Sequence, residues 1–149
     1  MEKHSRIHAV IDLDAVERNF EQMKKNLTPG TQMIAVVKAN AYGHGAVPIA
    51  RMMEPKEYIW GFAVATVEEA VSLRENGIEK PVLILGYVFP EDYKCLVRLK
   101  IRPAVFTLEM AEALSRTAGE AGTVLPIHLA VDTGMTRIGF RDPQKSLED

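Results

Sequence analysis

The chain has 149 residues, a hydrophobic fraction of 47%, and 18 basic against 20 acidic side chains, which gives a formal net charge of −2. This length is enough for one domain with a hydrophobic core, and the small, interspersed charge argues against a nucleic-acid partner. The single cysteine, Cys95, excludes a disulfide framework and a cysteine-based metal site, and the lack of a long apolar run or signal-peptide pattern predicts a cytoplasmic protein without a membrane partner.

In chain order, short apolar runs typical of buried strands alternate with segments whose apolar residues recur at helical spacing. The first helix is predicted to begin at Asp14, with Glu17 completing a capping box. Thr66 with Glu69, and later Thr107, are expected to cap two further helices. The strands are predicted over residues 8–13, 32–39, 58–65, 81–86, 102–106 and 125–131, and the helices over residues 15–27, 46–53, 67–76, 90–99 and 108–118.

This order of elements indicates an α/β fold built from parallel βα units, because the strands are almost continuously apolar and the links are short. Five such strands follow the N-terminal segment. No linker or change of composition divides the chain, so we expect residues 1–149 to belong to one domain. A closed (β/α)₈ barrel needs eight strands and about 250 residues. The pattern therefore predicts either an open, doubly wound five-stranded sheet or an incomplete TIM barrel.

The most informative segment is residues 36–45, Val-Val-Lys-Ala-Asn-Ala-Tyr-Gly-His-Gly. An apolar strand brings Lys38 to its carboxyl end, the edge at which ligands bind in parallel sheets and barrels. An amine held there, partly out of water, is more readily unprotonated and can attack an aldehyde. The obvious biological aldehyde is pyridoxal phosphate. The ordinary alternative is a strand-end lysine that extends into solvent.

Residues 35–45 resemble the cofactor-lysine motif of the fold-type III, pyridoxal-phosphate-dependent alanine racemases. Segments that agree with this family in order and spacing are residues 11–15 with an asparagine at 19, residues 62–66 followed by Glu68-Glu-Ala and Leu73-Arg, residues 81–86, and residues 132–139, Asp-Thr-Gly-Met-Thr-Arg-Ile-Gly. The resemblance covers the whole chain. It implies the N-terminal part of a (β/α)₈ barrel domain, followed in the family by a C-terminal β-domain that is absent here, in an enzyme that works as a head-to-tail homodimer.

The resemblance also implies roles for individual residues. Lys38 would form the aldimine with pyridoxal 5′-phosphate and act as one of two bases at the substrate's α-carbon. Tyr42 would hydrogen-bond the cofactor phosphate, and Leu85 would touch the cofactor ring. Arg137 would bind near the cofactor's phenolic oxygen and the substrate carboxylate. Without the resemblance, Tyr42 would be interpreted as a ring packed over the barrel mouth, Leu85 as a barrel-core leucine, and Arg137 as a surface arginine in an ion pair. His44 is expected to be a loop histidine and not a base.

The chain departs from the family pattern at Ala130, where many members carry a lysine, often carboxylated, that orients the arginine. Support for Arg137 therefore has to come from elsewhere. Asp132 is interpreted as a loop organiser that bonds local backbone N–H groups. The family's second base is a tyrosine of the C-terminal domain, contributed across the dimer, and no residue of this chain matches it.

These observations predict an amino-acid racemase that interconverts L- and D-alanine, the latter for bacterial cell-wall synthesis, with this portion inactive by itself. One alternative is a single-domain pyridoxal-phosphate-binding homeostasis-type protein without racemase activity, and another is serine or a second small amino acid as substrate. An open five-stranded sheet would expose edge strands, so we also expect the chain to associate.

Overall fold

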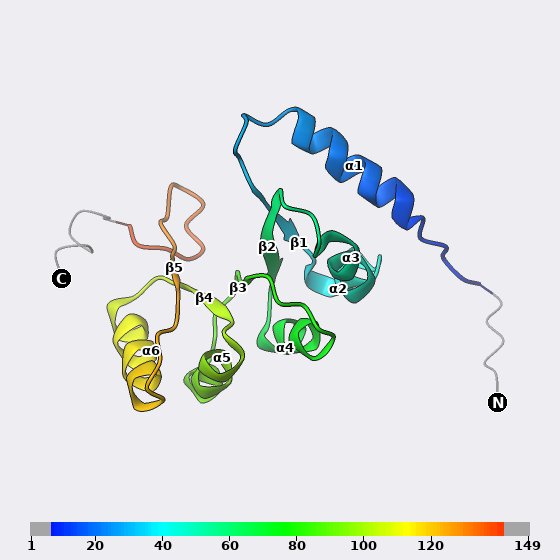
Figure 1. Ribbon diagram of the computed structural model, residues 1–149. Coiled ribbons are helices and arrows are strands. Elements are labelled where there is room, and N and C mark those ends of the chain that lie inside the picture. Colours follow the sequence, from blue (N-terminus) through cyan, green and yellow to red (C-terminus); the bar gives the residue numbers. More distant parts are fainter. Residues whose placement is uncertain (1–6, 142–149) are drawn as a thin grey trace, which may run out of the picture.

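The computed structural model describes residues 7–141, which form one curled, parallel sheet with helices packed along it (Figure 1). The sheet order follows the chain order, β1-β2-β3-β4-β5. A doubly wound sheet reverses its strand order at a switch point, so this sequential order excludes that alternative and confirms an incomplete TIM barrel. The strands are β1 (Met33–Val36), β2 (Ile59–Val64), β3 (Val82–Ile84), β4 (Arg102–Val105) and β5 (His128–Leu129).

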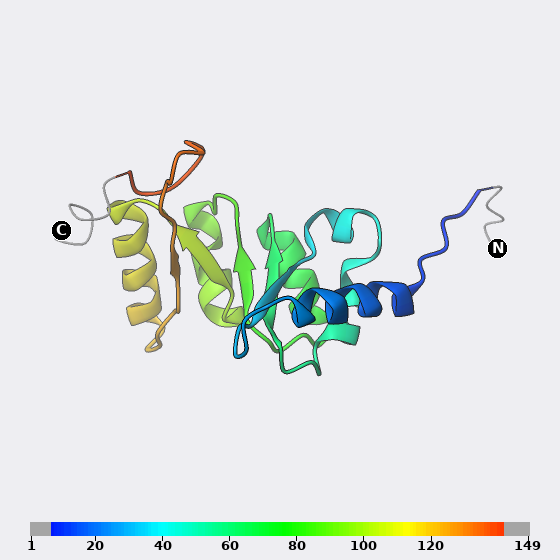
Figure 2. The same ribbon diagram turned by 90° about the horizontal axis from the view of Figure 1, so that it is seen from above.

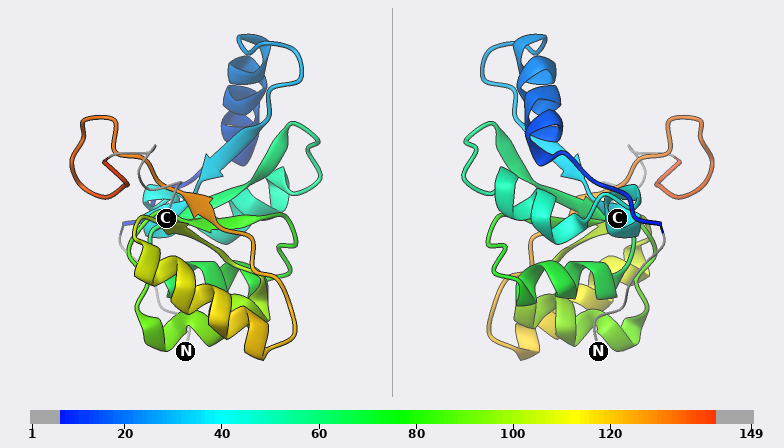
Figure 3. Two further views of the ribbon diagram at one scale, coloured as in Figure 1. Left: turned by 90° about the vertical axis from the view of Figure 1, so that its left-hand side faces the viewer. Right: turned by 90° about the vertical axis from the view of Figure 1, so that its right-hand side faces the viewer.

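Helices cover the convex face of this half-barrel. Neighbouring helices from α3 to α6 contact one another in order around the arc, and α1 packs next to α3 at the β1 end (Figures 1 and 3). The helices are α1 (Leu13–Lys25), α2 (Lys38–Tyr42), α3 (Ala46–Met53), α4 (Val67–Glu75), a 3₁₀ turn η1 (Pro90–Asp92), α5 (Tyr93–Leu99) and α6 (Leu108–Glu120). Within residues 7–141, we find no helix with the length and apolar character that a membrane crossing requires.

The core lies between the strands and these helices. In parallel strands, paired residues point to the same face, so the pairing of Ala35 with Phe62, and of Phe62 with Val82, defines a helix-facing side. Side chains on this side are at most 2% exposed. On the concave side, Ile34 and Val36 are 39% and 44% exposed. The helix-facing strand residues are Ala35, Phe62, Val64, Val82, Ile84 and Val105.

A three-residue stack joins three strands at the amino-terminal end of the sheet. The guanidinium of Arg102 lies 4.9 Å from the ring centre of Trp60, and the ring of His128 lies 5.4 Å from the same ring. Desolvation, with a smaller effect of the nearby Arg102 charge, lowers the pKa of His128. These contacts give the floor of the half-barrel a fixed arrangement of side chains from β2, β4 and β5.

The predicted strand over residues 8–13 is wrong. Residues 7–12 have no regular structure, and no strand of the described part of the chain pairs with them. Helix α1 begins at Leu13, and its N-cap is Asp12, not Asp14, because the extended backbone of Asp12 lets its carboxylate accept from the Ala15 N–H at 3.0 Å. Asp14 instead lies in the first turn, where its charge complements the helix dipole.

Other boundaries differ from the sequence predictions for local reasons. Strand β1 ends at Val36 because the backbone leaves the extended region at Val37, and β5 does not begin before His128, since Pro126 has no N–H to pair. Pro90 begins a 3₁₀ turn ahead of α5. The remaining strand and helix predictions agree with the structure to within two residues at each end, and the Thr66 and Thr107 caps are confirmed, because each hydroxyl accepts the backbone N–H three residues later.

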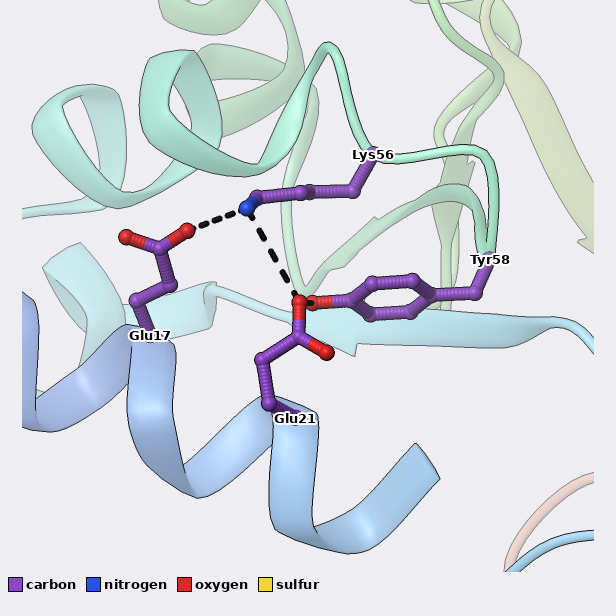
Figure 4. Close-up of polar contacts among 4 residues, drawn as sticks. All are labelled: Glu17, Glu21, Lys56 and Tyr58. Atoms are coloured by element: carbon purple, nitrogen blue, oxygen red, sulfur yellow. Dashed lines mark hydrogen bonds and ion pairs between the residues drawn. The ribbon is translucent and has the colours of Figure 1, made fainter. Parts of the chain in front are cut away.

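Helix α1 has no buried residue and is held to the half-barrel by a polar cluster (Figure 4). Lys56 forms ion pairs with Glu17 and, at 3.8 Å, with Glu21. The Tyr58 hydroxyl donates to Glu21 Oε1 at 2.8 Å, and the Lys24 ammonium lies 4.7 Å from the Tyr58 ring centre. Partly buried apolar residues of α1 add packing beneath this cluster.

Ionisation of Tyr58 is expected to weaken this attachment at high pH. Burial, then the Glu21 hydrogen bond and the two negative charges, raises the pKa of Tyr58 from 10 to about 12. In the unfolded chain the phenol ionises near pH 10, so the stabilisation is complete below pH 10 and is lost as the pH rises through 12. Between pH 9 and pH 11, the free energy of unfolding measured by urea denaturation should therefore fall about 1 kcal/mol further in the wild type than in Tyr58→Phe.

The matched control is Tyr87→Phe, because Tyr87 is 51% exposed. This variant should lose stability with pH in parallel with the wild type. Equal pH dependence in the wild type and Tyr58→Phe would show that the phenol of Tyr58 does not contribute in this way.

Candidate functional site at the carboxyl end of the sheet

The segments after β1 and after β5 lie on the same side of the half-barrel, at the carboxyl ends of the strands (Figure 2). Lys38 comes two residues after the end of β1 and is half-buried. The residues around it, Ala35 and Val37, are each 2% exposed and belong to the core. Lys38 therefore stands at the carboxyl end of β1, the ligand-binding edge of the sheet, as the sequence predicts, although the strand itself is shorter.

Lys38 leads into one turn of left-handed helix. Ala39, Asn40 and Ala41 have φ near +50° and ψ near +46°, and Tyr42 also has a positive φ of 54°. Consecutive non-glycine residues in this region are rare, because each places its Cβ close to the next carbonyl oxygen at a cost of about 1–2 kcal/mol. Strain of this kind concentrates at functional sites, where the surrounding structure has to maintain it.

Hydrogen bonds hold the turn at both ends. The Val37 N–H donates to the Ala63 carbonyl of β2 at 2.8 Å, which fixes the entry. At the exit, the Asn40 side-chain oxygen accepts from the N–H of Ala46 at 2.9 Å, and the Asn40 carbonyl accepts from the N–H of Gly45 at the same distance. Ala41 is 6% exposed and packs into the core. The handedness of the turn is thus set by its surroundings and not by local sequence preference.

Glu69, on α4, is the residue of this site that sequence reasoning missed. Its Oε1 accepts from the Ala39 N–H at 2.6 Å, and its Oε2 accepts from the Ala65 N–H at 2.8 Å. The predicted capping box would have directed this carboxylate to the N–H of Thr66, the N-cap of its own helix, whereas it bonds the N–H before the cap, that of Ala65, and the N–H of Ala39. The sequence signal was present in the acidic residue three positions after Thr66, but its partner, Ala39, is 30 residues earlier in the chain.

The other residues at this edge differ in exposure. Tyr42 is 63% exposed, so its phenol is available to a ligand. Leu85 directly follows β3 and is half-buried, with its backbone N–H bonded to the Val64 carbonyl at 2.8 Å. His44 lies with Nδ1 3.1 Å from the Ala41 carbonyl oxygen, within its own loop. This contact agrees with the expectation of a loop histidine.

Asp132 organises the loop that carries Arg137. Its Oδ1 accepts from the N–H groups of Thr136, at 2.8 Å, and Gly134, at 3.0 Å. These two bonds, with a smaller effect of the Arg141 charge, lower the pKa of Asp132. Thr136 has a φ of 55°, unusual for a β-branched residue, and the carboxylate holds it there. The interpretation of Asp132 as a loop organiser is therefore confirmed.

Arg137 is exposed, and no hydrogen bond or ion pair joins it to Lys38 within residues 7–141. The two residues follow β1 and β5, the opposite edge strands of the sheet. Four interstrand steps of about 4.8 Å separate these edges by about 19 Å along the sheet. The structure thus places Lys38 and Tyr42 after the end of β1 and Leu85 after the end of β3, with β2 between these two strands, and Arg137 in the segment after β5.

Comparisons with known proteins give one consistent result. Residues 11–148 match the family model described as alanine racemase, N-terminal domain. An alanine racemase from Ligilactobacillus salivarius is 40% identical over 142 residues, which are 95% of this chain and 38% of that protein. The chain thus spans about 38% of the length of this curated relative.

Solved structures agree with the sequence relatives. An alanine racemase from Clostridium difficile 630 superposes with a TM-score of 0.89 at 37% identity, covering 93% of this chain and 36% of that chain. A histidine racemase from Leuconostoc mesenteroides superposes with a TM-score of 0.79 at 32% identity, covering 91% and 36%. Racemases of two different amino acids therefore share this half-barrel.

Proposed function

This chain belongs to the alanine racemase family, and we propose that it is the cofactor-lysine part of a pyridoxal-phosphate-dependent amino-acid racemase, with alanine as the substrate. The observation that carries the proposal is Lys38, half-buried just after the carboxyl end of β1 and followed by a strained turn. A strand-end lysine that only extends into solvent would not require such a turn.

The residues at this edge fit the cofactor. Lys38 offers an amine, Leu85 offers an apolar surface at the end of β3, two strands along the sheet, and the exposed Tyr42 offers a hydroxyl donor for a phosphate. Pyridoxal phosphate, when bound, supplies an aldehyde that condenses with an amine and a ring system that accepts electrons from the substrate's α-carbon. These groups of the chain are those that the resemblance assigns to cofactor binding.

In the proposed reaction, Lys38 holds the cofactor and then removes or returns a proton at the substrate's α-carbon. Tyr42 binds the phosphate, and Leu85 packs against the ring. Arg137 binds the substrate carboxylate with its planar guanidinium. Arg137 follows β5, at the opposite edge of the sheet from β1, so in this role the ligand lies between the two edges.

Racemisation needs a second base on the other face of the α-carbon, and we propose that it comes from the β-domain found in the longer relatives, across a homodimer. By itself, the 149-residue chain would then be a cofactor-binding part without racemase activity. In the whole enzyme, the product D-alanine would serve cell-wall synthesis in a bacterial cytoplasm. The likeness to a histidine racemase supports the wider class, amino-acid racemase, as the second candidate.

Lys38 is expected to be the main site of covalent cofactor attachment in this chain. Mixing the protein with pyridoxal phosphate, reducing with borohydride and mapping the phosphopyridoxyl group by mass spectrometry should place most of it on Lys38. Lys38→Ala should remove this label and the visible absorption band that precedes reduction. Lys94→Ala, which removes an exposed lysine of α5, should leave both unchanged. Label scattered evenly over the surface lysines would contradict the proposal.

A further inference from the structure

We propose that Glu69 is a positioning residue for Lys38: its carboxylate fixes the start of the left-handed turn and thereby the direction in which the amine leaves the sheet. The inference rests on the proposed function of Lys38 and adds a residue from a different element, α4, to the same site. The two carboxylate oxygens bond the backbone at the ends of two neighbouring strands, β1 and β2.

The contact acts on the peptide unit that follows Lys38. The Ala39 N–H belongs to the peptide that begins with the Lys38 carbonyl, so a carboxylate on this N–H orients that peptide plane. At 2.6 Å the bond is short, as expected for an N–H donating to a charged acceptor, and such bonds are about twice as strong as neutral ones. The second oxygen is anchored on the Ala65 N–H, so the carboxylate cannot swing away without breaking both bonds.

The turn needs such an external restraint. Its internal hydrogen bonds begin at Ala41 and involve mostly its later residues, whereas Ala39, at its start, has Glu69 as its acceptor within residues 7–141. With about 1–2 kcal/mol of strain for each left-handed residue, a right-handed or extended path would compete if this restraint were lost. The Lys38 backbone would then turn, and its amine would leave the sheet in a different direction.

The neighbouring residue Glu68 separates this role from ordinary helix capping. It lies in the same first turn of α4 with the same charge, but it is exposed. Hydrogen bonds to its own backbone N–H and to the Thr66 side chain lower the pKa of Glu68. Glu68 therefore serves the helix terminus alone, while the carboxylate of Glu69 joins the segment before that helix, at Ala65, to the turn after Lys38. The pair provides a matched test within one helix turn.

The test compares Glu69→Gln with Glu68→Gln in the borohydride-labelling experiment. A glutamine at 69 has one acceptor oxygen and one NH₂ donor, so it cannot accept from both N–H groups. We expect the labelling rate at Lys38 to fall at least tenfold in Glu69→Gln, while Glu68→Gln labels as the wild type does. The unfolding midpoint of each variant is measured in parallel, to establish that the labelling rates are compared between folded proteins.

The outcomes distinguish the two proposals. If the wild type does not label Lys38 selectively, the proposed function fails. If the wild type does so and Glu69→Gln labels Lys38 at the same rate, the function stands and the role of Glu69 is overturned. Should Glu69→Gln fail to fold, amide exchange in the wild type decides: we expect the Ala39 N–H to exchange at least roughly a hundredfold more slowly than an unstructured amide. Exchange at the unstructured rate would equally overturn the inference.

Discussion

Replacing Gly61 with alanine is expected to destabilise the half-barrel by about 3 kcal/mol or more, which is a large fraction of the total stability of a small domain. Gly61 lies in the buried strand β2, and a Cβ at this position would lie 2.3 Å from the Pro81 carbonyl oxygen. That oxygen accepts the Phe62 N–H at 2.8 Å as part of the pairing with β3. Because the obstacle is backbone, the methyl group can be accommodated only by moving β3 away from β2.

Urea denaturation followed by the fluorescence of Trp60 measures this effect, because the single tryptophan of the chain is the residue directly before Gly61. The matched control is Gly119→Ala in α6, where an added Cβ would meet nothing within 4 Å. In a helix, alanine is favoured over glycine, so this variant should be neutral or up to about 1 kcal/mol more stable. Equal effects of the two substitutions would mean that the close approach at Gly61 is not a constraint.

Arg74→Ala is the second substitution with a large expected effect, a loss of about 3–5 kcal/mol in the free energy of unfolding. Arg74, in the last turn of α4, is half-buried, and its guanidinium connects α4 to the segments that lead into β3 and β4. It donates to the carbonyl oxygens of Ile78 at 2.7 Å, Lys80 at 2.8 Å, Leu99 at 3.0 Å and Lys100 at 3.2 Å. Removing the side chain leaves these acceptors without their charged donor.

A lysine at this position tests whether geometry or charge is responsible. The single ammonium of Arg74→Lys cannot reproduce the fork of the guanidinium, so we expect about half of the stability loss to remain. Arg98→Ala, on the exposed side of α5, should change the unfolding free energy by no more than about 0.5 kcal/mol. Thermal or urea denaturation of the three variants measures the series. A loss in Arg74→Ala no greater than in Arg98→Ala would refute this account.

The regular part of the fold could be predicted from the sequence because its signals are local. Apolar runs and threonine caps located β2, β3 and α4 closely, and the short links between elements predicted parallel units. The predictions failed where the structure of a segment depends on contacts with residues distant in the sequence. Residues 8–13 have the composition of a strand, but a strand requires a partner, and the structure gives this segment none within the described residues.

The candidate site shows the same division. Lys38 was predicted to stand at the carboxyl end of β1, and its place in the structure agrees. The left-handed turn after it was not predicted, because alanine and tyrosine have no preference for positive φ and only Asn40 tolerates it well. The carboxylate that restrains this turn lies 30 residues away in sequence, beyond the reach of any local pattern. The roles of Tyr42, Leu85 and Arg137 in binding remain predictions.

The alternation of exposure along β1 has a consequence for how this strand accepts change. Ile34 and Val36 face open space on the concave side, so polar replacements at these two positions leave the packing behind the sheet intact. Ala35 lies between these two residues and Val37 follows them, and each is only 2% exposed. In such a close-packed core, even one added methylene would disturb the packing. Neighbouring positions of one short strand thus tolerate opposite kinds of substitution.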